Sequence, residues 1–245
     1  VHELAAKRLK LRYRQAVFGV LWAVIQPVVA SAVFTFVFAR LADVDTSPIP
    51  YHVFAWCGFA FWLFFSSCVL GITESLVENS HLITKVAFPR LAPPIASVLP
   101  PLVDLGVALL ALLPVMAWSG IYPTWQVVAL PLALLMVASA AAGLGLLLAT
   151  LNVRFRDAGH ATPLILQVLL FASPVAYPSQ LVAGMRHHVY ALDPMVGALD
   201  LARWGLVGAA PPERDIVISA ASALALLLAG LVYFARHEVR FADEL

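Results

Sequence analysis

Six long runs that are almost free of charge limit what this chain can fold into. Each run holds about 20 residues, the length that an α-helix needs to cross the hydrocarbon core of a bilayer. Hydrophobic residues make up 62% of the 245-residue chain, and a water-soluble domain of this size cannot bury so much apolar surface. The sequence therefore predicts an all-α membrane protein that forms one domain over residues 1–245, with spans at about 16–39, 53–73, 91–117, 125–151, 158–180 and 216–235.

Most basic residues fall on one side of these spans. Lys and Arg precede the first span and follow the second, fourth and sixth, whereas the opposite side receives only Arg40, Arg186, Arg203 and Arg214. Cytoplasmic loops carry the excess of Lys and Arg in multi-pass proteins, so both termini are predicted to be cytoplasmic. Because the chain begins with Val1 rather than Met, we also expect that some N-terminal sequence precedes it.

The first 15 residues are predicted to form a basic helix on the membrane surface. Ala5, Leu9 and Tyr13 recur at helical spacing on one face, which is typical of a helix that lies in the membrane interface. The alternative is that the basic residues only set the orientation of the chain in the membrane. That would explain their charge but not the helical spacing of the apolar residues. The basic residues lie mostly on the other face and are Lys7, Arg8, Arg12 and Arg14.

The fifth span and the segment after it are irregular. Three prolines between residues 163 and 178 interrupt backbone hydrogen bonding in the span. A further helix is predicted to start with Asp193 as its cap and Pro194 at its first position, and to run to about Val207. It is too short to cross the membrane and too apolar for water, so a re-entrant or interfacial helix fits.

Asp200 and Arg203 are three residues apart on this short helix and therefore share a face. Two interpretations of the pair stay open. It is an ion pair at the membrane interface, or it belongs to a lid over an exit path.

The segment ENSHLITKVAFPRLAPP, residues 78–94, joins the second and third spans on the predicted cytoplasmic side. A plain membrane loop would be short and polar, whereas this one combines charged, amide and hydrophobic residues. Hydrophobic side chains at a cytoplasmic turn suit a small docking surface for another protein. The four that point to such a surface are Leu82, Ile83, Val86 and Phe88.

Asp104 lies near the middle of the third span, where an ionisable group is costly and so is a candidate functional residue. No Lys or Arg lies within a span to pair with it, and its candidate hydrogen-bond partners are Gln26, His160 and Gln167. A single acid makes a poor proton relay, so a structural or cavity-lining role is favoured over proton transfer.

Aromatic residues crowd the second span, among them Trp56, Phe59 and Trp62. Lipid contact explains such rings, and a stacking surface for sugar rings is the alternative; spacing alone favours lipid contact. Small residues at 138–145 in the fourth span indicate close packing against another helix.

Signatures of catalysis are absent from the sequence. It contains no GxxxxGK[ST] phosphate loop and no metal-type spacing of His and Cys. Cys57 and Cys68, placed on one helix, would lie about 16 Å apart, too far for a disulfide. The sequence therefore predicts a protein that is not an enzyme and binds neither a cofactor nor a metal.

Six segments, taken together and in this order, resemble the permease subunits of type-2 ABC exporters. Within that class they look most like the exporters of O-antigen, capsule, teichoic acid and related polysaccharides. The resemblance covers nearly the whole chain. The segments are RYRQAVFGVLWAVIQP (12–27), ENSHLITKVAFPRLAPP (78–94), LNVRFRDA (151–158), SPVAYPS (173–179), LDPMVGALDLARWGLVG (192–208) and RHEVRFADEL (236–245).

The resemblance implies partners and a location. A second copy of the chain would complete a channel in a bacterial inner membrane, with membrane lipid around it, and two separate ATPase subunits would bind ATP and Mg beneath it. The cargo would be a lipid-linked glycan, and no nucleic acid is involved. An exporter of a small amphiphile or drug shares this fold and these partners. A proton-coupled secondary transporter, which would depend on Asp104 and need no ATPase, is the alternative from another class.

The resemblance also implies roles for particular segments. Residues 1–15 match the family's interface helix, 74–90 its coupling helix and 181–208 its gate helices. His81 departs from the small amide residue expected there. The implied ATPase-coupling residues are Glu78, His81, Leu82, Ile83, Lys85, Val86, Phe88 and Arg90, and the implied interface-helix residues are Lys7, Arg8, Arg12 and Arg14. The implied residues elsewhere are Arg154, Arg156 and Asp157 in a cytoplasmic loop, Trp56, Phe59, Trp62, Asp104 and Tyr177 in the channel, and Asp193, Asp200, Arg203 and Trp204 in the gate.

Overall fold

The computed structural model describes residues 21–42, 44–80, 89–182, 185–211 and 215–241. Over these residues the fold is helical and contains no strand, as the sequence predicts. The main helices are α2 (Trp22–Phe34), α3 (Tyr51–Glu78), α5 (Ala92–Ala96), α6 (Leu99–Trp118), α7 (Leu130–Arg154), α8 (Asp157–Ala172), α9 (Met185–Tyr190), α10 (Pro194–Val207) and α11 (Ile216–His237). The π-helical and 3-10 turns are η2 (Thr35–Leu41), η3 (Trp125–Ala129), η4 (Ser179–Leu181) and η5 (Glu238–Arg240).

Five helical stretches are long and apolar enough to cross a membrane, so the chain is a multi-pass membrane protein. They coincide with five of the six predicted spans. The stretches are Trp22–Leu41, Tyr51–Glu78, Ala92–Trp118, Trp125–Arg154 and Ile216–His237.

The span predicted at 158–180 is a shorter helix in the structure. α8 has 16 residues, or about 24 Å of helix against a hydrocarbon core of about 30 Å. It ends at Ala172 because Ser173 precedes Pro174, and a residue before proline is pushed out of the α conformation. Ser173 is extended, with φ −85° and ψ 153°. Six full-length spans are therefore not confirmed, since the described residues hold five spans and this shorter helix.

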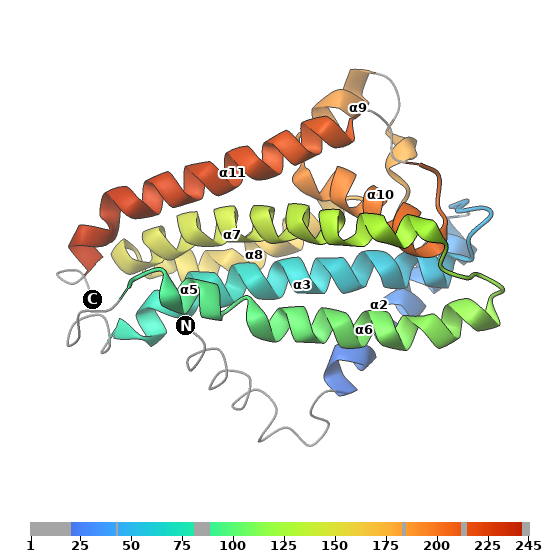
Figure 1. Cartoon of the computed structure of the whole chain (residues 1–245), viewed down its shortest axis with the longest axis horizontal. Helices are drawn as coiled ribbons and strands as arrows, with labels where there is room; N and C mark the ends of the chain where they lie inside the picture. The colour runs from blue at the N-terminus through green and yellow to red at the C-terminus, as the bar shows by residue number, and fades with distance from the viewer. Residues whose placement is uncertain (1–20, 43, 81–88, 183–184, 212–214, 242–245) are drawn as a thin grey trace.

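α3 lies at the centre of the bundle and is the most deeply buried of the five spans. It packs against α7 on one side and α6 and α2 on the other, while α11 covers the outer side of α7 (Figure 1). α2 and α11 keep most of their surfaces exposed. The start of α3, the end of α8 and all of α10 meet at one end of the bundle, which is the outer end according to the predicted orientation (Figure 1).

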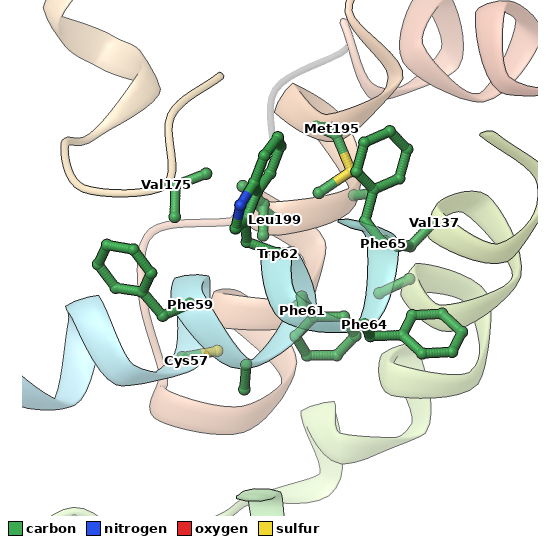
Figure 2. Close-up of a cluster of buried hydrophobic side chains, with 14 of the residues drawn as sticks. Cys57, Phe59, Phe61, Trp62, Phe64, Phe65, Val137, Val175, Met195 and Leu199 are labelled. Carbon is green, nitrogen blue, oxygen red and sulfur yellow. The ribbon is translucent and has the colours of Figure 1, made fainter. Parts of the chain in front are cut away.

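The core is built around the aromatic residues of α3. Figure 2 shows Phe61, Trp62 and Phe65 among side chains from other helices, including Val137 of α7 and Met195 of α10. Lipid tails are as apolar as these side chains, so the association of the helices rests on close packing rather than on escape from water.

α7 and α11 approach closely through glycine, as the small residues at 138–145 predict. A Cβ on Gly143 would overlap the backbone of Leu226 in α11, and a Cβ on Gly230 would overlap the backbone of Gly143. Each glycine therefore leaves room for the opposite helix, which is how small residues bring membrane helices together.

Candidate transport site

The backbone after α8 is held by side chains instead of by a continuing helix. Once the helix stops at Ala172, its last carbonyls have no N–H partner in the next turn. Membrane-buried carbonyls without partners are costly, so broken helices persist only where other groups donate to them. Five carbonyls between Phe171 and Ala176 accept hydrogen bonds from Tyr177, Arg203 and Tyr51.

Tyr177 satisfies the first two of these carbonyls. Its hydroxyl lies 3.0 Å from the carbonyl oxygen of Phe171 and 3.1 Å from that of Ala172. The hydroxyl of Tyr190 lies 3.0 Å from the same oxygen. Carbonyls only accept, and Tyr177 has one proton to give. Tyr177 therefore donates to the end of α8, and Tyr190 donates to Tyr177.

Arg203 satisfies the next two carbonyls with both arms of its guanidinium. Nη1 donates to the carbonyl of Pro174 and Nη2 to that of Val175, each at 2.7 Å. The guanidinium carbon lies 3.7 Å from the centre of the Phe54 ring, a cation–π contact. Tyr51 donates to the carbonyl of Ala176 and completes the row. The side chains that hold the break thus come from α3, from α10 and from Tyr177 just beyond it.

Asp193 links the same break to the start of α10. The Ser173 hydroxyl donates to Asp193 Oδ2 at 2.6 Å, and the Met195 N–H donates to Asp193 Oδ1 at 3.0 Å. Burial raises the pKa of Asp193, while these two hydrogen bonds act to lower it. α10 begins at Pro194 and ends at Val207, as predicted, and its cap is Asp193.

Asp200, Arg203 and Trp204 of α10 have different partners. The Ser179 hydroxyl donates to Asp200 Oδ2 at 2.6 Å, so Asp200 ties η4 to α10. Trp204 meets Trp125 edge to face, with 5.7 Å between ring centres. Asp200 and Arg203 also border a pocket of about 300 Å³. Its other lining residues are 45–49, Phe54, 178, 180–181 and 209–210.

Trp56, Phe59 and Trp62 are buried inside the chain. Phe59 packs on Phe34 of α2 with 4.8 Å between ring centres, and Trp62 packs on Phe65 at 5.4 Å. The Trp56 indole N–H is buried without an acceptor among the described residues. In this arrangement the three rings form core, and their assignment to the channel stays a prediction.

Asp104 lines a small cavity between three spans. Gln26 of α2 and Ser67 of α3 border the same cavity, whose volume of about 20 Å³ is enough for about one water molecule. Of the three candidate partners for Asp104, Gln26 is therefore nearby, and His160 and Gln167 do not border the cavity.

The opposite end of the bundle carries the predicted cytoplasmic residues. Asp157 is the first residue of α8, and the Arg154 guanidinium lies 5.1 Å from the Phe155 ring. Arg156 and Glu78 are exposed, and Arg90 lies in the turn that leads into α5. The other predicted coupling residues and the interface-helix residues lie outside the described part of the chain: His81, Leu82, Ile83, Lys85, Val86 and Phe88, and Lys7, Arg8, Arg12 and Arg14.

Sequence reasoning missed several residues that connect the helices. Asn152 of α7 donates to the Thr73 carbonyl of α3 at 3.1 Å and accepts from the Gly159 N–H of α8 at 2.9 Å. Tyr51 and Gly58 lie beside Arg203. Gly58 could have been noticed in the sequence, because it is a glycine within a run of large aromatic residues. Nothing local marks Asn152 or Tyr51.

The structure gives no sign of a metal centre where it describes the chain. Among those residues, no three His, Cys, Asp or Glu side chains come together as ligands for an ion.

Comparison with known proteins gives matches along almost the entire chain. The family model described as "ABC-2 type transporter" matches residues 1–207. The O-antigen export system permease protein RfbA of Myxococcus xanthus is 28% identical over 246 residues, which cover 99% of this chain and 94% of that protein. Two proteins of the same name from Klebsiella pneumoniae are 25% and 26% identical, and each match covers 98% of this chain and 92% of the relative. The chain therefore belongs to the ABC-2 type transporter family of membrane proteins.

Proposed function

We propose that this chain is the permease subunit of an ATP-driven exporter of a lipid-linked polysaccharide of the O-antigen, capsule or teichoic-acid kind. The observation that carries the proposal is its similarity to three O-antigen export permeases over 92% to 94% of their own length. The similarity thus covers all the described spans and the broken helix between them, and not one shared segment.

In this proposal the chain forms a path and does no chemistry. Two copies enclose the path in the inner membrane, with both termini in the cytoplasm. Two partner ATPase subunits bind ATP and Mg. The segment 74–90 docks on an ATPase, and Glu78 and Arg90 are its coupling residues within the described part of the chain. The interface helix at residues 1–15 lies beside the same partner.

The outer end of the path is assigned to the segment 181–208. Asp193, Asp200, Arg203 and Trp204 belong to this gate, and Tyr177 is assigned to the channel. The broken end of α8 supports the assignment, because irregular backbone at membrane depth occurs where it is buried in protein or lines a cavity.

Depletion of the protein from its own cells tests the proposal. Surface polysaccharide and lipid-linked glycan retained inside the cell are measured together. We expect loss outside with accumulation inside, because synthesis continues while export stops. A variant of the partner ATPase that cannot hydrolyse ATP is the matched control and should give the same result. Unchanged glycan on both sides would favour the exporter of a small amphiphile or drug.

Asp104→Asn separates the exporter from a proton-coupled transporter. Asp104 shares its cavity with Gln26 and Ser67, and Asn can replace its hydrogen bonds but cannot carry a proton. We expect export to fall by less than about threefold, as for a modest change in a polar cavity. Loss of all export, with the complex still assembled, would point to proton coupling and away from ATP as the energy source.

A further inference from the structure

Arg203 is a charged side chain in a place where charge is costly. It is 1% exposed, although it belongs to a short helix at the predicted outer end of the bundle. A buried cation is retained only where several groups compensate for its lost hydration. The described residues around Arg203 include such groups.

Two kinds of contact compensate the charge, together with the electrostatic attraction of the nearby Asp200 carboxylate, while Nε is buried without an acceptor among the described residues. Both terminal nitrogens donate to backbone carbonyls, at Pro174 and Val175, and the guanidinium carbon lies over the ring of Phe54. Arg is suited to this because its planar fork makes two directed hydrogen bonds and stacks on an aromatic face. A lysine ammonium in the same place could not reproduce the fork. The contacts therefore select arginine and not charge alone.

The protein keeps space for this guanidinium at one position of α3. A Cβ on Gly58 would lie 2.5 Å from Nη2 of Arg203 and 2.5 Å from the carbonyl oxygen of Val175. No carbon atom can approach either atom so closely. Any side chain at residue 58 must displace the fork, the carbonyl or both. By contrast, a Cβ on Gly106 of α6 would meet no atom within 4 Å.

The fork joins three segments that the chain order keeps apart. It fixes the backbone after α8 to α10, and through Phe54 and Gly58 it seats both on the outer end of α3. Arg203 and Asp200 also form part of the wall of the outer pocket. Arg203 is therefore one of the side chains that fix that wall relative to α3, together with Tyr51 and Asp193.

We propose that Arg203 is a positioning residue for export: its fork locks the broken end of α8, the start of α3 and α10 into one unit that sets the outer opening of the path. This rests on the proposed function for its transport readout. The lock itself is a property of the protein alone and has its own readout.

Four variants of the permease, each assembled with its ATPase, test the lock. Arg203→Met keeps length and volume but removes the donors, and Arg203→Lys keeps the charge without the fork. Gly58→Ala places a methyl group of α3 against the Arg203 fork, and Gly106→Ala is its matched control. For each complex we would measure assembly, hydrogen exchange of peptides covering 173–182, and export per assembled complex.

We expect Arg203→Met and Gly58→Ala to speed exchange in 173–182 at least tenfold and to lower export per complex at least tenfold. Arg203→Lys should fall between these and the wild type, and Gly106→Ala should match the wild type. If Arg203→Met does not assemble, Gly58→Ala and Arg203→Lys carry the same comparison.

Two outcomes would overturn the lock. In the first, the variants reduce the amount of complex while export per complex stays at the wild-type level, which is the pattern of a merely structural residue. In the second, exchange in 173–182 is unchanged. Failure of the proposed function looks different, because depletion then leaves the glycan unaltered. The hydrogen-exchange result tests the lock independently of the exported cargo.

Discussion

At the outer end of the bundle, side chains donate the hydrogen bonds that backbone N–H groups supply within a regular helix. Tyr177 and Arg203 supply donors to carbonyls that α8 leaves open, and Tyr190 orients Tyr177. Hydrogen bonds to such groups matter most when they are missing, because a desolvated carbonyl without a donor costs about 1–3 kcal/mol. The break is therefore a specified structure in which four side-chain donor groups serve five carbonyls.

Asp193 gives a pH-dependent prediction. Burial raises its pKa above the ordinary value of 3.8, so the folded protein favours the neutral carboxyl more than the unfolded chain does. That stabilisation is complete below the ordinary pKa and is lost as pH rises through the raised pKa. Asp193→Asn cannot ionise, so its unfolding temperature relative to wild type should rise from about pH 4 to about pH 7.

Asp45 is the control for this experiment. It is exposed, and hydrogen bonds from Ser47 lower its pKa. Its stabilisation is present above the ordinary pKa and is lost as pH falls, so Asp45→Asn should show the opposite trend and a smaller one. Parallel trends in the two variants would contradict the assignment of the effect to burial at Asp193.

Local chemistry explains which single residues the sequence could predict. Asp193 was identified because a cap and the proline after it are neighbours in the chain, and capping depends on nothing further away. The sequence did not identify the hydrogen-bond partners of Arg203. A backbone carbonyl has no signature in the sequence, and Val175 is 28 residues away from Arg203. Spacing alone paired Arg203 with Asp200, whereas its hydrogen bonds go to the chain after α8.

The short helix α10 is defined at both ends. Asp193 caps its start, and Gly208 ends it in the left-handed conformation, with φ +71°. The sequence predicted the start from the Asp193 cap and Pro194, which are local signals, and it placed the end at about Val207. It could not predict where α8 stops with the same accuracy, since three prolines lie in that region and the helix continues past Pro163 but ends before Pro174.

Gly208 provides a test of that termination. A Cβ there would meet nothing within 4 Å, so Gly208→Ala carries only the backbone cost of the left-handed conformation, roughly 1–2 kcal/mol. Gly208→Asn should cost less, because asparagine tolerates that conformation. Thermal unfolding of the assembled protein measures both. Equal losses in the two variants would mean that the conformation of residue 208 is not what limits the substitution.

The whole molecule was predictable to the extent that the membrane dictates it. Length and lack of charge marked five spans correctly, because hydrocarbon leaves few ways to satisfy a backbone. The placement of the aromatic residues was harder to predict. Trp56, Phe59 and Trp62 turn inward among α2, α7 and α10, and a hydrophobic residue facing protein looks the same in sequence as one facing lipid.

The docking assignment is tested on the assembled complex. Phe88→Asp places a charge in the predicted docking surface, so we expect export to fall at least tenfold with the membrane part still folded, as when a charge is buried in an interface without a partner. The control is Val239→Asp, since Val239 is 75% exposed at the same end of the bundle. Normal ATP hydrolysis and normal export in Phe88→Asp would show that the segment does not dock.

α3 extends without a proline from Tyr51 to Glu78. Its 28 residues make a helix about 42 Å long. Glu78 lies at one end, and Tyr51, which donates to the Ala176 carbonyl, lies at the other. One unbroken helix therefore connects the Glu78 end of the bundle to the hydrogen bonds that hold the break after α8, without an intervening loop. In mechanical terms α3 is a strut, because its side chains are packed along almost its whole length.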